Sequence, residues 1–404
     1  MRYLLVPFFV AVLVSFAVIV SSRRHGHFSA DADLTGPQKF HSRPVPRIGG
    51  LGIFLGIALC ALVSWWQGRD AELGLRLLVC GLPAFLSGLI EDVTKQVSPS
   101  KRLAATAMSA ALAAGLLDAQ ITRTGIVGLD WLFQFPLVGF MVTIVAVSGV
   151  ANSVNIIDGF NGLASMCVML MLVAFAYVAH EVGDMELTFW AIACVGATLG
   201  FFVWNFPAGM MFLGDGGAYF LGFMVAEIGI LLVSRHPEVS PLFALLVCIY
   251  PVFETLFSIY RRSFIRATPP GLPDGIHLHS LIYRRLMRWA ISAQDARALT
   301  RRNSMTSPYL WTLCIFSLVP AVLFWDSTLL LALWLVLFGV LYVVLYWRIV
   351  RFKTPRLLMA RRARREVQAP TVVQFEEHRV VRAEAEALQT QPASVAGQGS
   401  ARHP

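Results

Sequence analysis

Acidic, amide and histidine side chains gather in four polar stretches of an otherwise apolar chain. The stretches are EDVTKQVSPSKR (91–102), NSVNIIDGFNGL (152–163), NFPAGMMFLGDGGA (205–218) and a loop over 260–307 that contains PDGIHLHSLIYRR. The oxygen atoms of Asp and Asn are hard ligands that suit Mg²⁺ or Mn²⁺, whereas His and Arg suit a diphosphate. Together these residue types predict a site for metal-assisted phosphoryl transfer, in which positioning and charge neutralisation do most of the work.

Glu91 and Asp92 are adjacent at the end of an apolar segment. Neighbouring side chains on a helix point about 100° apart, so the two carboxylates can converge only where the helix ends. The following Ser98-Pro99 indicates such an end. The pair is either the solvated end of a helix or a carboxylate pair for proton abstraction or cation binding.

Asp158 belongs to a series of four polar residues with three-residue spacing. If the segment stays helical, this spacing places their side chains near one face; the alternative is a plain turn between two helices. Asp215 lies among three glycines at the start of the next apolar segment, where backbone N–H groups suit a phosphate. The spaced residues are Asn152, Asn155, Asp158 and Asn161.

His277 and His279 are two residues apart, whereas a helical zinc pair prefers a spacing of four. With the nearby arginines they fit a diphosphate better than a structural metal, and a solvated basic loop is the alternative. Glu254 lies within an apolar segment, where an ionisable group is a functional candidate by default. It can instead form a structural pair with Arg261 or Arg262.

The elements that must position these residues are membrane helices. The chain has 404 residues, of which 57% are hydrophobic and only 14% charged, with a mean hydropathy of +0.66. This composition predicts an all-α polytopic membrane protein. The six cysteines lie inside apolar runs, which predicts buried thiols rather than disulfides. The apolar segments are 3–22, 48–66, 73–90, 103–117, 136–151, 164–180, 187–204, 217–233, 241–259, 308–325 and 328–347.

Eleven segments predict a bundle of about 10–11 transmembrane helices over residues 1–347. Residues 348–404 form a basic tail that we expect to be largely disordered. Lys and Arg gather in alternate loops, which predicts that the N-terminus lies outside, the C-terminus in the cytoplasm and all four polar stretches on the cytoplasmic face. The net charge of +9 is then a topology signal that favours anionic lipid headgroups and not nucleic acid.

Five ordered motifs resemble those of the polyprenyl-phosphate N-acetylhexosamine-1-phosphate transferases. They are HSRPVPRIGGLGIF, EDVTKQVSPSKRL, NSVNIIDGFNGLA, NFPAGMMFLGDGGAYFLG and DGIHLHSLIYRR. The resemblance implies a multi-pass enzyme of the bacterial inner membrane that uses Mg²⁺, with Mn²⁺ as the alternative ion. It implies transfer of a sugar 1-phosphate from a UDP-N-acetylhexosamine to undecaprenyl phosphate with release of UMP, the first membrane step of a cell-surface polysaccharide. It leaves a homodimer open.

The resemblance also implies a role for each matching position. Carboxylates in the second, third and fourth motifs have catalytic roles, and one amide and one carboxylate bind the metal. Basic, amide, aromatic and histidine side chains take the two substrates. The implied set is catalytic Glu91, Asp92, Asp158 and Asp215, metal-binding Asn155 and Asp215, and substrate-binding Arg43, Arg47, Asn161, Asn205, Phe212, His277 and His279.

Three positions depart from the family pattern and point to a subfamily. Glu91 replaces the first Asp of a pair, Asn161 replaces a common Asp, and Ser280 replaces a common His. A subfamily that serves O-antigen or exopolysaccharide synthesis is consistent with them. The alternatives are a transporter or flippase for a lipid-linked sugar and an inactive paralogue. A phosphatidyltransferase is a further alternative, although its D-G-x-x-A-R pattern does not follow Asp158.

Overall fold

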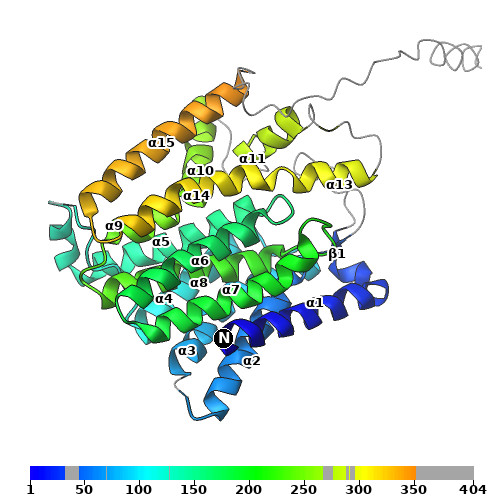
Figure 1. Cartoon of the computed structure of the whole chain (residues 1–404), viewed down its shortest axis with the longest axis horizontal. Helices are drawn as coiled ribbons and strands as arrows, with labels where there is room; N and C mark the ends of the chain where they lie inside the picture. Colours follow the sequence, from blue (N-terminus) through cyan, green and yellow to red (C-terminus); the bar gives the residue numbers. More distant parts are fainter. Residues whose placement is uncertain are drawn as a thin grey trace, which may run out of the picture. The chain divides into compact units, whose positions relative to one another are not determined.

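The computed structural model describes residues 1–31, 45–69, 71–126, 128–266, 276–287, 291 and 296–351. These residues form a bundle of helices, which confirms the all-α prediction (Figure 1). The sheet in this part of the chain is a pair of two-residue strands, in which β1 (Ala30–Asp31) runs antiparallel to β2 (Val45–Pro46). The bundle is therefore built by helix packing.

The helices follow the apolar segments closely. Short 3₁₀ and π turns (η1 Asp130–Gln134, η2 Arg261–Arg266 and η3 Ile282–Met287) join them. The α-helices are α1 Arg2–Ser29, α2 Gly49–Trp66, α3 Glu72–Thr94, α4 Pro99–Leu116, α5 Pro136–Ile157, α6 Leu163–Glu181, α7 Met185–Asn205, α8 Gly214–Arg235, α9 Pro241–Val247, α10 Ile249–Tyr260, α11 Leu278–Leu281, α13 Ala296–Ser304, α14 Ser307–Leu323 and α15 Thr328–Val350.

Nine helices of the described chain are long and apolar enough to cross a membrane, and a tenth span is counted if α9 and α10 form one. Two of the eleven predicted spans need correction. The segment 103–117 forms α4, but this helix begins with a polar turn and is not among the nine. The segment 241–259 is broken at Cys248, where α9 and α10 meet at a bend of 73°. The polytopic prediction itself is confirmed.

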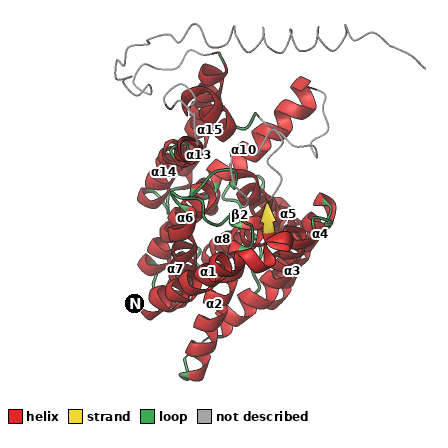
Figure 2. Ribbon diagram, turned by 90° about the vertical axis from the view of Figure 1, so that its right-hand side faces the viewer, coloured by secondary structure: helices red, strands yellow, loops and turns green. Residues whose placement is uncertain are grey.

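Helix α8 is the centre of the bundle, with 94% of its spanning window buried (Figure 2). Glycines let two neighbours approach the first turn of α8 closely. A Cβ atom on Gly50 of α2 would overlap the backbone of Gly217, and one on Gly88 of α3 would overlap that of Asp215 and Gly216. Small residues of this kind are how membrane helices bring their backbones together. The packing therefore fixes the position of Asp215.

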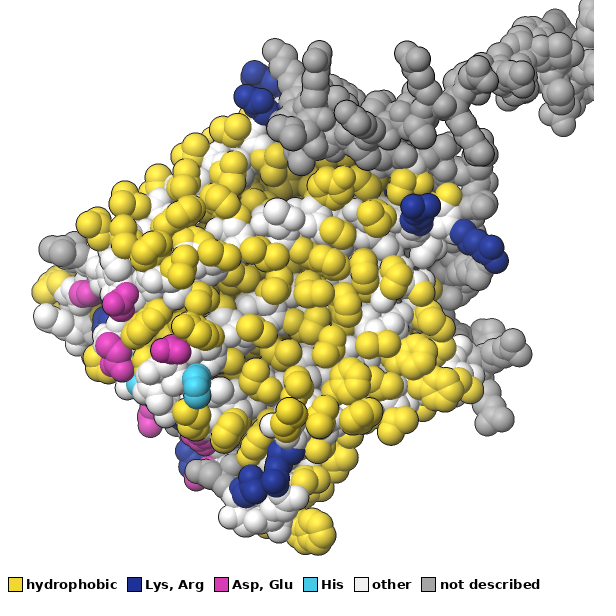
Figure 3. All heavy atoms as spheres, viewed as in Figure 1, with side chains coloured by type: hydrophobic (Ala, Val, Ile, Leu, Met, Phe, Trp, Pro, Cys, Tyr) yellow, Lys and Arg dark blue, Asp and Glu magenta, His cyan; other side chains and the backbone are white. Residues whose placement is uncertain are grey.

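The outer surface is mostly apolar, and charged side chains gather at its edges (Figure 3). The start of α1 lies beside the end of α2, where Arg2 donates to Gln67. The end of α15 lies at the other end of the bundle, where Arg285 donates to the carbonyl of Ile349 at 2.7 Å. The six cysteines are buried and free, as predicted. These surfaces fit a protein that spans a bilayer.

Candidate functional site

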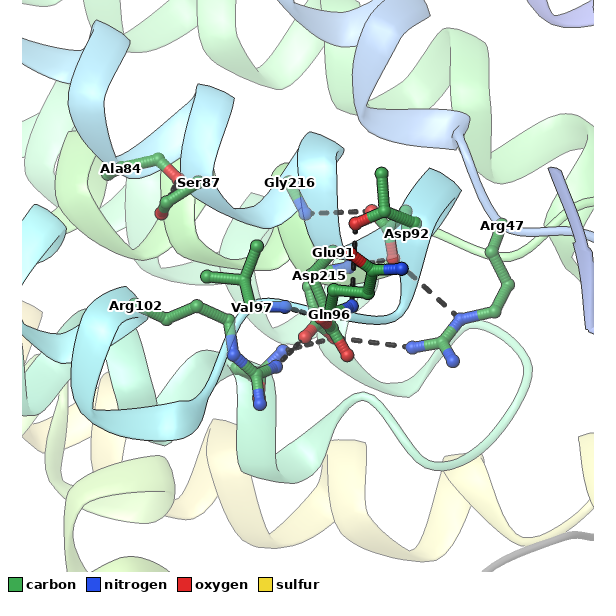
Figure 4. Close-up of polar contacts among 12 residues, drawn as sticks. Arg47, Ala84, Ser87, Glu91, Asp92, Gln96, Val97, Arg102, Asp215 and Gly216 are labelled. Carbon is green, nitrogen blue, oxygen red and sulfur yellow. Dashed lines mark hydrogen bonds and ion pairs between the residues drawn. The ribbon is translucent and has the colours of Figure 1, made fainter. Parts of the chain in front are cut away.

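Asp215 in the first turn of α8 is the centre of the site. Gly214, which precedes it, has φ +76° and turns the chain into the helix. Oδ1 of Asp215 accepts from Nη2 of Arg47 at 3.2 Å and from Nδ2 of Asn155 at 3.1 Å. Oδ2 accepts from Arg102 (Figure 4). Residues from the β2–α2 connection, α4 and α5 therefore converge on one carboxylate.

Asp92 holds the backbone of the same turn. Its carboxylate accepts from the N–H groups of Asp215 at 2.9 Å and Gly216 at 3.0 Å, and it lies 3.8 Å from Nε of Arg47. A carboxylate at a helix N-terminus satisfies N–H groups that have no partner within the helix. We expected these N–H groups to be available for a phosphate; two of them are instead occupied by Asp92.

Glu91 does not act on the same point as Asp92. Its Oε2 accepts from the N–H of Val97 at 2.7 Å and closes the turn that follows α3 (Figure 4). The third helix continues to Thr94, so the two neighbouring side chains keep their angular separation. In this structure Asp92 contacts the backbone that carries Asp215, whereas Glu91 contacts the turn that follows α3.

Asp158 follows the end of α5 and lies half-buried near Arg47. Burial raises the pKa of its carboxyl to about 7, although the charge of Arg47 acts to lower that pKa. The histidine segment (His277 to His279) lies beside this loop: a Cβ atom on Gly159 would be 3.4 Å from Nε2 of His279. The rings of His277 and His279 stack, with centroids 5.1 Å apart. The structure therefore brings the third and fifth motifs together.

The predicted polar face over 152–161 breaks after Ile157, where α5 ends. The buried Asn161 contacts the end of α13, where its Nδ2 donates to Oγ of Ser304 at 3.2 Å. Its own backbone N–H donates to Oδ1 of Asn303 at 2.9 Å. An amide can donate here and a carboxylate cannot, which gives a local reason for Asn instead of Asp.

Asn205 joins two loops of the site. Its Oδ1 accepts from the N–H of Gly162 at 2.5 Å, and its Nδ2 donates to the carbonyl of Met211 at 2.7 Å. Phe212 is half-buried, and its carbonyl accepts from the N–H of Gly49 at 3.0 Å. Backbone groups thus engage the amide that the resemblance assigns to substrate binding, and they place Phe212 beside the start of α2.

Arg43, Arg102 and Glu254 also bear on the sequence predictions. Arg43 lies outside the described residues. Arg102 was not among the predicted site residues, and its only signal was a basic position one turn into the helix that follows Pro99. Glu254 does not pair with the arginines we considered; it pairs with His277, with Oε1 and Nδ1 3.0 Å apart.

The oxygen donors at this site suit a magnesium ion. Among the described residues, no group of three or more His, Cys, Asp or Glu side chains is arranged to hold a metal. Mg²⁺ commonly takes one or two carboxylates and completes its shell with water and substrate phosphates. Asp215 and Asn155 supply such a partial set, since the amide oxygen of Asn155 remains as a ligand while its nitrogen donates to Asp215. The residues therefore fit the ion.

Comparisons with known proteins agree with the resemblance that the sequence motifs carry. The model of the family described as glycosyl transferase family 4 matches residues 75–233. A probable undecaprenyl-phosphate N-acetylglucosaminyl 1-phosphate transferase of Bacillus subtilis (strain 168) is 25% identical over 351 residues, which are 86% of this chain and 91% of the relative. A phospho-N-acetylmuramoyl-pentapeptide-transferase of Streptococcus pneumoniae (strain Hungary19A-6) is 30% identical over 259 residues, which are 60% and 76% of the two chains.

Proposed function

The chain belongs to glycosyl transferase family 4, and we propose that it transfers a sugar 1-phosphate from a UDP-N-acetylhexosamine to undecaprenyl phosphate and releases UMP. The observation that carries the proposal is the convergence of Asp92, Asn155 and two arginines on Asp215. The names of the relatives support undecaprenyl phosphate as the acceptor and a phosphorylated amino sugar as the transferred group.

We assign the metal to Asp215 and Asn155. A bound Mg²⁺ would neutralise charge on the donor diphosphate and orient it for attack. Arg47 and Arg102, which contact Asp215 in this structure, are placed to reach the phosphates at the same point. Asp92 acts indirectly, because it fixes the backbone that carries Asp215.

We propose that Asp158 takes a proton from the lipid phosphate. The second pKa of a phosphate monoester is about 6, so part of the acceptor carries a proton near neutral pH. A carboxyl with a pKa of about 7 can accept that proton and release it again at the same pH. His277 and His279, stacked beside the Asp158 loop, are then placed to contact the donor diphosphate.

The proposed orientation places the site in the cytoplasm of a bacterium and the N-terminus outside. The N-terminus and the site lie at opposite ends of the bundle, and the end of α15 lies at the site end. The basic side chains of Arg47 and Arg102 lie at the site end, which therefore faces the cytoplasm in this proposal. A transporter for a lipid-linked sugar would usually have its polar site near the bilayer midplane. The site at one end of the bundle favours a transferase.

The test uses purified protein, undecaprenyl phosphate, Mg²⁺ and UDP-N-acetylhexosamines supplied one at a time. We expect UMP release with at least one donor, and loss of that release when a chelator removes the cation. Release that persists without divalent cation would contradict the metal assignment. If every donor fails to release UMP, the transferase proposal is wrong, and a flippase or an inactive paralogue becomes the better account.

A further inference from the structure

Glu254 is a buried carboxylate of α10 on which three donors converge. Oε1 lies 3.0 Å from Nδ1 of His277 and accepts from the N–H of Leu278 at 2.9 Å. Oε2 accepts from the hydroxyl of Tyr342 at 2.7 Å. Only 2% of Glu254 is exposed, and a buried carboxyl is tolerated where its oxygens are used as acceptors. The contacts join α10, the start of α11 and α15.

The same contacts determine which nitrogen of His277 carries hydrogen. The Leu278 N–H can only donate, so Oε1 of Glu254 acts as an acceptor there. Nδ1 of His277 faces that same oxygen and therefore donates to it. A carboxylate that accepts from one ring nitrogen fixes the tautomer and the ring orientation. A neutral His277 then carries its hydrogen on Nδ1 and its lone pair on Nε2.

Ring packing connects His277 to the loop that carries Asp158. Its ring stacks on that of His279 with an interplanar angle of 13°. The ring of His279 in turn packs edge-on against Phe160, with centroids 5.5 Å apart, and lies next to Gly159. One carboxylate on α10 is thus connected to the loop that carries Asp158.

Helix α15 anchors this arrangement through two tyrosines four residues apart. Tyr342 donates to Glu254, and the hydroxyl of Tyr346 accepts from Nη1 of Arg261 at 2.6 Å. The same Nη1 donates to the carbonyl of Ile276, directly before the histidine segment, at 2.6 Å. Much of the rest of α15 is exposed on the apolar surface. The two tyrosines of this helix therefore hold Glu254 and Arg261, which in turn contact the segment that carries His277.

We propose that Glu254 is a positioning residue of the transferase site. It sets the tautomer of His277 and holds the stacked histidines against the Asp158 loop. The inference rests on the proposed function, because it assigns the histidines to the donor diphosphate. Glu254 itself touches no substrate in this arrangement and acts through His277.

The first test is a double-mutant cycle on kcat/KM for the UDP-sugar. In Glu254→Gln the side chain keeps its size, but its nitrogen cannot accept a hydrogen bond. Loss of a partner that orients a histidine typically costs about 10–100-fold in activity, so we expect a decrease of that size. In the His277→Asn background the same substitution should cost less than about twofold, because the residue through which it acts is gone. Equal fold-losses in both backgrounds would overturn the proposal.

The second test does not depend on activity. In ¹⁵N NMR of histidine-labelled protein, the parent should show His277 protonated at Nδ1, with its signal assigned by its loss in His277→Asn. Glu254→Gln should shift this signal. A parent whose Nδ1 carries no hydrogen would contradict the inference. A parent that releases no UMP would contradict the proposed function, while the NMR result would still test the positioning.

Glu186→Gln is the matched control for both tests. Glu186 is a carboxylate at the other end of the bundle, where it pairs with Arg235 at 3.2 Å. We expect parent activity and an unchanged His277 signal. Tyr342→Phe removes one donor to Glu254 and leaves the His277 contact in place. Its loss of activity should be smaller than that of Glu254→Gln, and a larger loss would contradict the assignment of the effect to His277.

Discussion

Asp92→Asn removes the negative charge that holds the first turn of α8. In the parent, the two carboxylate oxygens of Asp92 accept from the N–H groups of Asp215 and Gly216. Asparagine supplies one acceptor oxygen, and its NH₂ group faces the other N–H. One charge-assisted hydrogen bond is lost, and one buried N–H loses its acceptor.

The loss can be expressed in two quantities. A hydrogen bond to a charged group contributes about 1.5–3 kcal/mol to the free energy of unfolding, so we expect a decrease of that size. The turn carries Asp215, and a displacement of about 1 Å at a reacting centre costs about 100-fold in rate. This corresponds to about 2.7 kcal/mol in the free energy of the transition state. We therefore expect kcat/KM to fall by about 100-fold.

The assay is UMP release together with Tm in the same detergent. The matched control is Glu91→Gln, which changes the neighbouring residue but keeps an acceptor for the Val97 N–H. We expect its kcat/KM to stay within about threefold of the parent, as for a substitution that retains its hydrogen bond. If Asp92→Asn matches the parent in both measurements, or if Glu91→Gln loses as much activity, the separation of the two carboxylates is wrong.

The remaining predictions concern packing, pH and stability. Gly88→Ala should lower the free energy of unfolding by about 1–3 kcal/mol, because the added Cβ would overlap the backbone of Gly216. We expect a lower Tm and lower activity, and parent values of both would contradict the close approach of the two helices. Burial raises the pKa of Asp158 to about 7, against the effect of the Arg47 charge, so kcat/KM should rise with pH through about 7. A parent profile that is flat in this range would contradict the proton transfer. So would an Asp158→Asn variant whose kcat/KM still rises with pH. Burial would raise the pKa of Asp184, but the Leu187 N–H, His236 and Arg235 outweigh it and lower that pKa. Its stabilising effect is present at neutral pH and lost as the pH falls through the lowered pKa, so Asp184→Asn should destabilise at neutral pH and converge with the parent in acid; a constant difference in Tm would argue against the ion pairs.

The sequence predicted most of the fold because membrane helices have a strong local signal. Each apolar segment became helical, and the polar motifs meet around Asp215. The bend at Cys248 has no comparable signal, since the residues on both sides of it are equally apolar. Helix α4 begins with the polar turn PSKR, so its apolar part is shorter than that of the nine candidate spans.

The roles of individual side chains depended on contacts between distant parts of the chain. Glu91 and Asp92 are neighbours, yet only the position of α8 decides which one enters the site. Asn161 donates to Ser304, which lies 143 positions later in the chain, and no local pattern indicates that contact. Glu254 reads as a partner for the nearby arginines, whereas its partner is the more distant His277. Spacing within a motif carries no information on such pairings.

The most direct test of the central claim is whether Asp215 is needed to form a sugar diphosphate lipid. Purified parent and Asp215→Ala would be compared with Mg²⁺, undecaprenyl phosphate and the donor that the parent uses, with the product identified by mass spectrometry. Glu186→Gln serves as a folded control that removes a carboxylate at the other end of the bundle. We predict product from the parent and the control, and none from Asp215→Ala. Product from Asp215→Ala at the rate of the parent would contradict the assignment of catalysis to this site.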